Sequence, residues 1–180
     1  MTTELRGIAP TDPRLAAWRA FLEAHARVSR RLDDELREAH SVSLPEYDAL
    51  VHLAAAPGGR LRMNVLAERV LLSRSGVTRL IDRLVADGLV ERTACTTDGR
   101  GAEAVLTPSG RSRLHDAAPT HLRGIRQYFL ETVSPDDLAA LERSLTAVAR
   151  CACDDEPRRE GAADGMGARA RRCRGIPADA

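Results

Sequence analysis

The chain has 180 residues, a length that suits one domain with a buried core rather than two. Its 27 basic and 26 acidic residues nearly cancel, so the net charge alone indicates neither a nucleic acid nor a membrane surface as partner. Every basic residue is arginine, so any contact with phosphate or bases would be made by guanidinium groups. No apolar run approaches the roughly 18 residues that span a bilayer, and we expect no membrane partner.

The start of the chain lacks the basic residues and apolar stretch of a secretory signal, so we expect a cytoplasmic protein. With 3% aromatic residues, the chain also lacks the stacking platform of single-strand nucleic-acid binders. The cysteines have the spacing of neither a disulfide framework nor two zinc-binding pairs, and we expect reduced thiols. They are Cys95, Cys151, Cys153 and Cys173.

Three helices are predicted in the first part of the chain. Apolar residues recur every three or four positions over 13–39, which predicts one long amphipathic helix. Ser43 and Glu46 have the spacing of a capping box, so a second helix is predicted from there to the break at 57–59. A short helix of about two turns follows over 64–70.

A capped helix and a hairpin are predicted next. Ser73 is a good N-cap residue, and Gly88 suits the left-handed position that ends a helix. Extended stretches are predicted over 89–92 and 103–106. The Asp-Gly pair at 98–99 between them is a hairpin signal.

Two further helices are predicted towards the C-terminus. The first begins at Thr107-Pro108 and reaches about Glu131, although Pro119 and Gly124 should bend or loosen it. The second begins over 134–137 and ends near Arg150. The apolar pattern stops after Cys153, and the composition that follows is typical of a disordered tail.

The order of elements over 61–106, a short helix, a capped helix and a hairpin, is typical of a winged helix-turn-helix. The fold class expected is therefore mainly α with a small β-hairpin wing. In such a domain the second helix enters the major groove of double-stranded DNA. One side of this helix is apolar, and the other begins with hydrogen-bonding residues that suit contacts to bases. They are Arg74, Ser75, Thr78 and Arg79; a solvated helix face is the alternative.

The predicted hairpin has Asp98 and Arg100 two positions apart, so their side chains would project to one side of an extended tip. The carboxylate would then orient the guanidinium, which suits insertion into a narrow minor groove. The alternative is a plain turn with a surface ion pair, worth about 0–1 kcal/mol.

Five stretches carry this pattern: Leu66-Ala67-Glu68, Ser73-Arg74-Ser75-Gly76-Val77-Thr78-Arg79-Leu80-Ile81-Asp82-Arg83-Leu84, Asp87-Gly88-Leu89-Val90-Glu91-Arg92, Asp98-Gly99-Arg100-Gly101 and Leu106-Thr107-Pro108-Ser109-Gly110. Together they resemble the MarR family of transcriptional regulators. The resemblance covers about residues 12–150, because the flanking helices also follow the family's order. One departure is Gly99, where the family's wing usually carries a second basic residue, so fewer electrostatic contacts are expected from the wing.

The resemblance implies a homodimer in which the long first helix and the last two helices interdigitate, leaving two winged domains to bind a pseudo-palindromic operator. It also implies repression relieved by a small ligand, often an aromatic acid. The domains expected are a flexible N-terminus (1–10), a dimerisation helix (11–42), a winged helix-turn-helix DNA-binding domain (43–107), C-terminal dimerisation helices (108–153) and a disordered tail (154–180).

A sharper hypothesis comes from the urate-responsive branch of the family. There the ligand or its signal involves a tryptophan on the first helix, an aspartate early in the second, and arginines on the recognition helix and at the start of the wing. Trp18, Asp48, Arg79 and Arg92 are at matching positions. An indole and guanidinium groups suit a planar anion, which makes these four residues candidates for binding a small aromatic or urate-like effector. The alternative is that Asp48, Arg79 and Arg92 support the fold or contact DNA and that Trp18, which lies on the apolar stripe of the first helix, belongs to the core.

Other functions find less support in the sequence. We expect no enzyme and no catalytic residues, because no nucleophile elbow, phosphate-binding glycine loop, metalloprotease motif or carboxylate pair is present. A winged helix that binds proteins instead of DNA is an alternative. Others are a metal-sensing regulator that uses the histidines with Cys151 and Cys153, and a thiol-sensing regulator that uses Cys95. No two histidines have the spacing of ligands on one helical face, so no metal site is expected. They are His25, His40, His52, His115 and His121.

Overall fold

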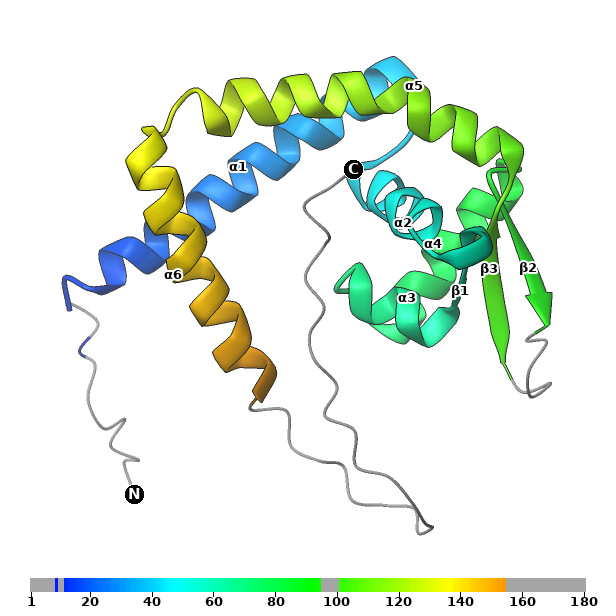
Figure 1. Cartoon of the computed structure of the whole chain (residues 1–180), viewed down its shortest axis with the longest axis horizontal. Helices are drawn as coiled ribbons and strands as arrows, with labels where there is room; N and C mark the ends of the chain where they lie inside the picture. The colour runs from blue at the N-terminus through cyan, green and yellow to red at the C-terminus, as the bar shows by residue number, and fades with distance from the viewer. Residues whose placement is uncertain (1–8, 10–11, 95–100, 155–180) are drawn as a thin grey trace, which may run out of the picture. The chain divides into compact units, whose positions relative to one another are not determined.

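Figure 1 shows the computed structural model of the chain, which describes residues 9, 12–94 and 101–154. It consists of two compact units, Met1–Glu131 and Thr132–Ala180. The first unit contains α1 (Leu15–His40), α2 (Leu44–Ala54), the 3-10 turn η1 (Pro57–Gly59), β1 (Arg60–Arg62), α3 (Met63–Arg69), α4 (Arg74–Ala86), β2 (Val90–Ala94), β3 (Ala102–Leu106), α5 (Pro108–Ile125) and the π-helical segment η2 (Arg126–Leu130); the second contains α6 (Pro135–Asp154).

Within the first unit, α1 and α5 lie side by side and run antiparallel (Figure 1). Nε2 of His40 and Oγ1 of Thr120 are 2.9 Å apart, while Arg123 lies 3.8 Å from the carboxylate of Glu35. The long helix predicted over 13–39 is therefore confirmed, and its C-terminal half is attached to α5.

The apolar stripe of α1 is covered only near its C-terminal end. Leu32 and Leu36 are the buried residues of this helix, whereas Trp18 near its start is 54% exposed. The possibility that Trp18 belongs to the core of the single chain is therefore wrong. The N-terminal half of α1 therefore presents large apolar side chains at the surface of the described chain.

The hydrophobic core lies among α2, α3, α4 and the sheet. The capping box that starts α2 is present, since Oε2 of Glu46 accepts from the amide of Ser43 at 2.9 Å and Oγ of Ser43 accepts from the amide of Glu46 at 3.4 Å. The capped helix predicted after Ser73 is α4, and the apolar side predicted for it is confirmed, because four of its residues are at most 2% exposed. They are Val77, Leu80, Ile81 and Leu84.

The sheet has three antiparallel strands in the order β1-β3-β2. The two strands predicted on either side of the Asp-Gly pair are β2 and β3, and Val90 pairs with Leu106 while Ala94 pairs with Ala102. The sequence did not predict β1. It is only three residues long, so its alternation of exposed and buried side chains is too short to be a signal.

The helix predicted from Thr107-Pro108 is present as α5. Pro119 lies inside it, and the regular helix changes to η2 shortly after Gly124. A Cβ at Gly124 would meet the side chain of Leu32, so glycine here allows α1 and α5 to approach closely. In the second unit, α6 extends to Asp154 rather than ending near Arg150.

Leu71, between α3 and α4, has a backbone φ of 54° and a side chain that is 90% exposed. This left-handed conformation costs an ordinary L-residue about 1–2 kcal/mol. We expect Leu71→Gly to raise the free energy of unfolding by about 0.5–1 kcal/mol, because relief of strain exceeds the added entropy of the unfolded chain. Urea unfolding measures this difference. Leu72→Gly is the control and should be destabilising; a loss of stability in Leu71→Gly would contradict the prediction.

Several sequence predictions fall outside the described residues. They include the wing tip with Asp98, Gly99 and Arg100, as well as Cys95, Cys173 and almost all of the predicted flexible ends. Within the described ranges, no helix has the length and apolar character needed to cross a membrane.

Candidate nucleic-acid interface

The N-terminal end of α4 is fixed by its cap. Oγ of Ser73 accepts a hydrogen bond from the amide of Gly76 at 3.1 Å and lies 3.2 Å from Oγ of Ser75. A Cβ at position 76 would lie 3.2 Å from the same Oγ, so glycine leaves room for the cap. The first turn of α4 therefore has a defined geometry although it is exposed.

The predicted DNA-contacting residues of α4 lie together on its exposed side. Arg74, Ser75, Thr78 and Arg79 are all exposed, on the side opposite the buried apolar face. The hydroxyl of Thr78 donates to the backbone carbonyl of Arg74 at 2.9 Å, so its oxygen remains an acceptor and its methyl group is held in place. Among the described residues, neither Arg74 nor Arg79 forms a salt bridge with a carboxylate.

Two arginine–carboxylate pairs attach α4 to its neighbours, and we call them the α4 clamp. Arg92 of β2 lies 2.7 Å from the carboxylate of Asp82 and donates to the carbonyl oxygen of Thr78 at 3.1 Å. On the other side of the helix, Arg83 donates to Glu46 of α2 at 2.7 Å. The clamp fixes α4 relative to both the wing and α2.

Arg92 gives a test of the clamp. If α4 binds DNA, we expect Arg92→Ala to weaken the binding of specific DNA about tenfold while lowering the free energy of unfolding by less than about 1 kcal/mol, since the pair is partly exposed. DNA titration and urea unfolding measure the two effects. In a double-mutant cycle with Asp82→Ala, the binding effects should be non-additive. Fully additive effects would contradict the clamp.

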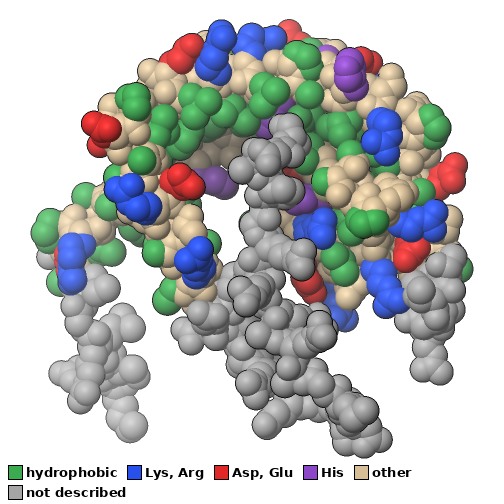
Figure 2. Space-filling view, viewed as in Figure 1, with side chains coloured by type: hydrophobic (Ala, Val, Ile, Leu, Met, Phe, Trp, Pro, Cys, Tyr) green, Lys and Arg blue, Asp and Glu red, His purple; other side chains and the backbone are tan. Residues whose placement is uncertain are grey.

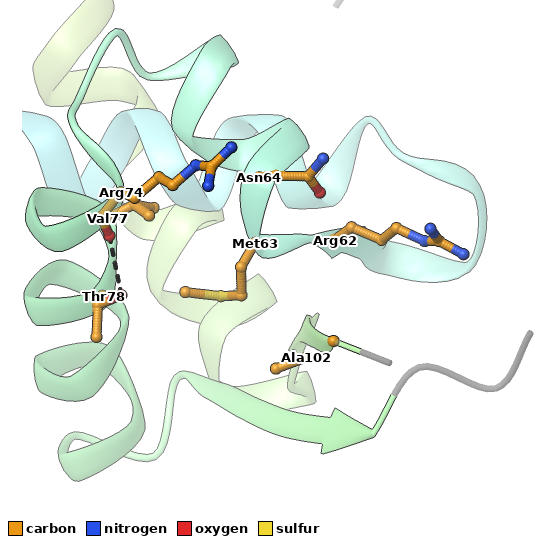
Figure 3. A pocket seen from close by; sticks show the side chains of 8 residues that line it. Arg62, Met63, Asn64, Arg74, Val77, Thr78 and Ala102 are labelled. Atoms are coloured by element: carbon orange, nitrogen blue, oxygen red, sulfur yellow. Dashed lines mark hydrogen bonds between the residues drawn. The ribbon is translucent and has the colours of Figure 1, made fainter. Parts of the chain in front are cut away.

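A cavity of about 380 Å³ lies beside the clamp, at the junction of α3, α4 and β3 (Figure 3). Arg74 and Thr78 line it from α4, whereas Arg62 and Asn64 line it from the start of α3. Sequence reasoning missed Arg62 and Asn64, because their place beside α4 depends on the unpredicted strand β1. On the face shown in Figure 2, arginine side chains lie over α3 and the strands.

The four effector candidates do not form one site in the single chain. Arg92 is engaged by Asp82 and Thr78 of α4. Trp18 contacts Phe21 on its own helix, with ring centroids 5.9 Å apart. Asp33 of α1 contacts the start of α2, because its carboxylate accepts a hydrogen bond from the amide of Leu44. Trp18 lies 15 residues before Asp33, which places it about 22 Å away from this contact along α1, at 1.5 Å per residue.

Asp48 lies on α2. Its side chain reaches the surface, but the surrounding protein partly desolvates the carboxyl and raises its pKa. Such a carboxyl favours a nearby cation or a hydrogen-bond donor.

No group of three or more potential metal ligands occurs within the described ranges. Burial lowers the pKa of His52 and of His121, which favours the neutral form of both rings. Cys151 is an exposed free thiol on α6. These residues do not form a centre at which metal or thiol chemistry can be assigned.

Comparisons with known sequences match the winged region. A sequence model of the MarR family matches residues 40–101. The chain is also 34% identical over 80 residues to the HTH-type transcriptional repressor YetL of Bacillus subtilis strain 168. This match spans 44% of the present chain and about half, 48%, of that relative.

Solved structures match most of the chain. AbsC, a MarR family transcriptional regulator from Streptomyces coelicolor, is similar with a TM-score of 0.77 and 31% identity, over 83% of this chain and 100% of that one. Sco3205, a MarR family regulator from the same organism solved in complex with DNA, has a TM-score of 0.77 and 30% identity, over 87% of this chain and 97% of its own.

Proposed function

The chain belongs to the MarR family of transcriptional regulators, and we propose that it is a DNA-binding transcriptional repressor that acts as a homodimer and responds to a small ligand. The similarity to a named repressor and to a regulator solved with DNA supports this role. The role is regulatory, not catalytic.

The observation that carries the proposal is the exposed polar side of α4. Its capped start presents guanidinium and hydroxyl groups, and the α4 clamp holds the helix from two sides. Arg79 would form a two-pronged hydrogen bond with guanine, a contact worth about 1–3 kcal/mol of base discrimination. Ser75 and Thr78 would contact or position neighbouring bases. Asp98 would orient Arg100 into the minor groove.

Exposed apolar side chains support a homodimer. Figure 2 shows hydrophobic side chains at the surface along α1 and α5. A second copy of the chain would cover them, and its α4 would occupy the next major groove about 34–36 Å away. The large exposed residues are Trp18, Phe21 and Leu22 on α1, Leu122 on α5 and Leu130 on η2.

The proposed ligand is a small aromatic or urate-like anion. For the four candidate residues to form one site, Trp18 of one chain would have to reach Asp48 and Arg92 of the other. An anion bound by Arg92 would compete with Asp82 and loosen the clamp. Titration of urate and simple aromatic acids, followed by Trp18 fluorescence and by release of DNA, tests this proposal. The absence of both responses would contradict it.

DNA binding is tested with duplexes selected by the full chain from a random pool. We expect the selected duplex to bind at least about 10³-fold more tightly than a scrambled one. The logarithm of the affinity should also fall with the logarithm of salt, by about 0.9 for each phosphate neutralised. Equal affinity for both duplexes, or no enriched sequence, would contradict the proposed function.

A further inference from the structure

The cavity at the junction of α3, α4 and β3 is lined by basic, polar and apolar side chains. Two arginines from different elements, Arg62 and Arg74, line the same volume of about 380 Å³. Asn64 and Thr78 add polar groups, while Met63 and Ala102 contribute apolar surface. No acidic side chain is among the described residues that line it.

The charges of this lining favour an anion. Guanidinium groups stay protonated at all physiological pH values, so the two arginines add positive charge to the lining. A backbone phosphate carries one negative charge and unbridged oxygens that accept from several donors at once. The amide of Asn64 adds a further donor. The described residues leave Arg74 without a salt bridge, so its charge remains available.

The side-chain directions distinguish Arg74 from Arg79. In Figure 3, Arg74 extends from α4 toward Asn64 at the start of α3. Arg79 is exposed more than one turn further along α4 and does not line the cavity. The two arginines on the exposed side of α4 therefore have different surroundings, although both are expected from the sequence to contact bases.

We propose that this cavity binds a backbone phosphate of the DNA through Arg74, with Asn64 and Arg62 as further contacts. The inference rests on the proposed function and refines it. Arg74 positions α4 on the duplex, and Arg79 carries the base discrimination. Phosphate contacts fix register and orientation but carry no sequence information.

The test uses the duplex selected by the full chain, with one phosphate at a time replaced by an uncharged methylphosphonate. We expect one replacement in each half-site to weaken binding of the wild-type chain about tenfold. The same replacement should have no effect on Arg74→Ala. That variant should bind every sequence more weakly by the same factor, and its salt slope should be smaller by about 1.

Conservative and control variants separate a phosphate contact from base readout. Arg74→Lys keeps the charge and should retain most of the affinity, whereas a two-pronged guanine contact would be lost. Arg69→Ala removes the same charge from the other end of α3 and should show the wild-type methylphosphonate pattern. Thermal unfolding of Arg74→Ala should match that of the wild type, because the side chain is exposed.

Two results would overturn the inference while the proposed function remains. One is a relaxed preference at a single base pair in Arg74→Ala, and the other is an identical methylphosphonate pattern in wild type and variant. A thermal shift with inorganic phosphate that depends on Arg74 and occurs without DNA would assign the cavity to a free anion instead. If the wild-type chain selects no DNA sequence, the proposed function fails as well.

Discussion

Replacement of Gly110 by alanine is expected to lower the free energy of unfolding by about 3 kcal/mol, the upper range for overpacking. Gly110 lies in the first turn of α5, where an added Cβ would overlap the backbone carbonyl oxygen of Leu89 and crowd Leu106. A backbone oxygen cannot rotate away as a side chain does, so the turn between α4 and β2 would have to separate from α5. The gain in helix propensity, about 1 kcal/mol, is smaller than this cost.

The same contact attaches the turn before β2 to the start of α5. The amide of Thr107 donates to the carbonyl oxygen of Leu89 at 3.1 Å. The side-chain hydroxyl of Thr107 donates to the carbonyl oxygen of Gly88 at 2.8 Å. Displacing this turn would also move the C-terminal end of α4. We therefore expect Gly110→Ala to lose affinity for specific DNA as well as stability.

Urea unfolding measures the effect on stability, and Gly124→Ala is a matched control in the same helix. The Cβ at position 124 would meet the end of the Leu32 side chain, which can shift, so a smaller loss of about 1 kcal/mol is expected. Equal stability of Gly110→Ala and the wild type would contradict the packing of α5 against Leu89.

Glu46→Ala is expected to lower the free energy of unfolding by about 2–3 kcal/mol. Glu46 is 8% exposed, and its carboxylate accepts from the amide of Ser43 and from Arg83. Removal of the Glu46 carboxylate would leave the amide of Ser43, a residue that is 1% exposed, without this hydrogen-bond acceptor. Asp137→Ala is the control and should cost about 1 kcal/mol or less, because the carboxylate of Asp137 accepts from the hydroxyl of Ser134 at the exposed start of α6. A loss no larger than that of the control would contradict the role of Glu46.

The contribution of Glu46 to the free energy of unfolding should decrease as the pH falls. Burial alone would raise the pKa of its carboxyl, but the hydrogen bonds from Ser43 and Arg83 outweigh this effect and lower the pKa. The stabilisation is thus complete above the ordinary value of about 4.3 and is lost as the pH falls through the lower pKa of the folded state. The difference in stability between the wild type and Glu46→Gln should therefore shrink in acid. A constant difference would contradict this linkage.

The sequence predicted the recognition helix well because its signals are local. Ser73 as cap, Gly88 as terminator and the spacing of the buried apolar residues all lie within one short stretch. These signals place Arg74 and Arg79 on the exposed side. They cannot distinguish the two arginines, because the surroundings of Arg74 come from α3 and β3.

The contacts that sequence reasoning missed link distant segments. The pairing of Glu46 with Arg83 spans 37 positions, and Arg92 reaches Thr78 across 14. No local pattern predicts such pairs. The strand β1 was missed for a different reason, since three residues provide too little alternation to separate a strand from a loop.

The exposed face of α1 shows another limit. The spacing of Trp18 and its neighbours predicted the helix correctly but not what covers its apolar side. A second copy of the chain provides that cover in the proposed dimer. An apolar stripe has the same appearance in a sequence whether it is buried within one chain or between two.

The most direct test of the account compares base preferences at every position of the selected duplex for the wild type and for Arg79→Ala. If Arg79 contacts a base, the variant loses discrimination at one base pair in each half-site, by about 1–3 kcal/mol, while preferences elsewhere are retained. An unchanged preference profile in Arg79→Ala, with the variant folded and bound to DNA, would contradict base recognition by α4.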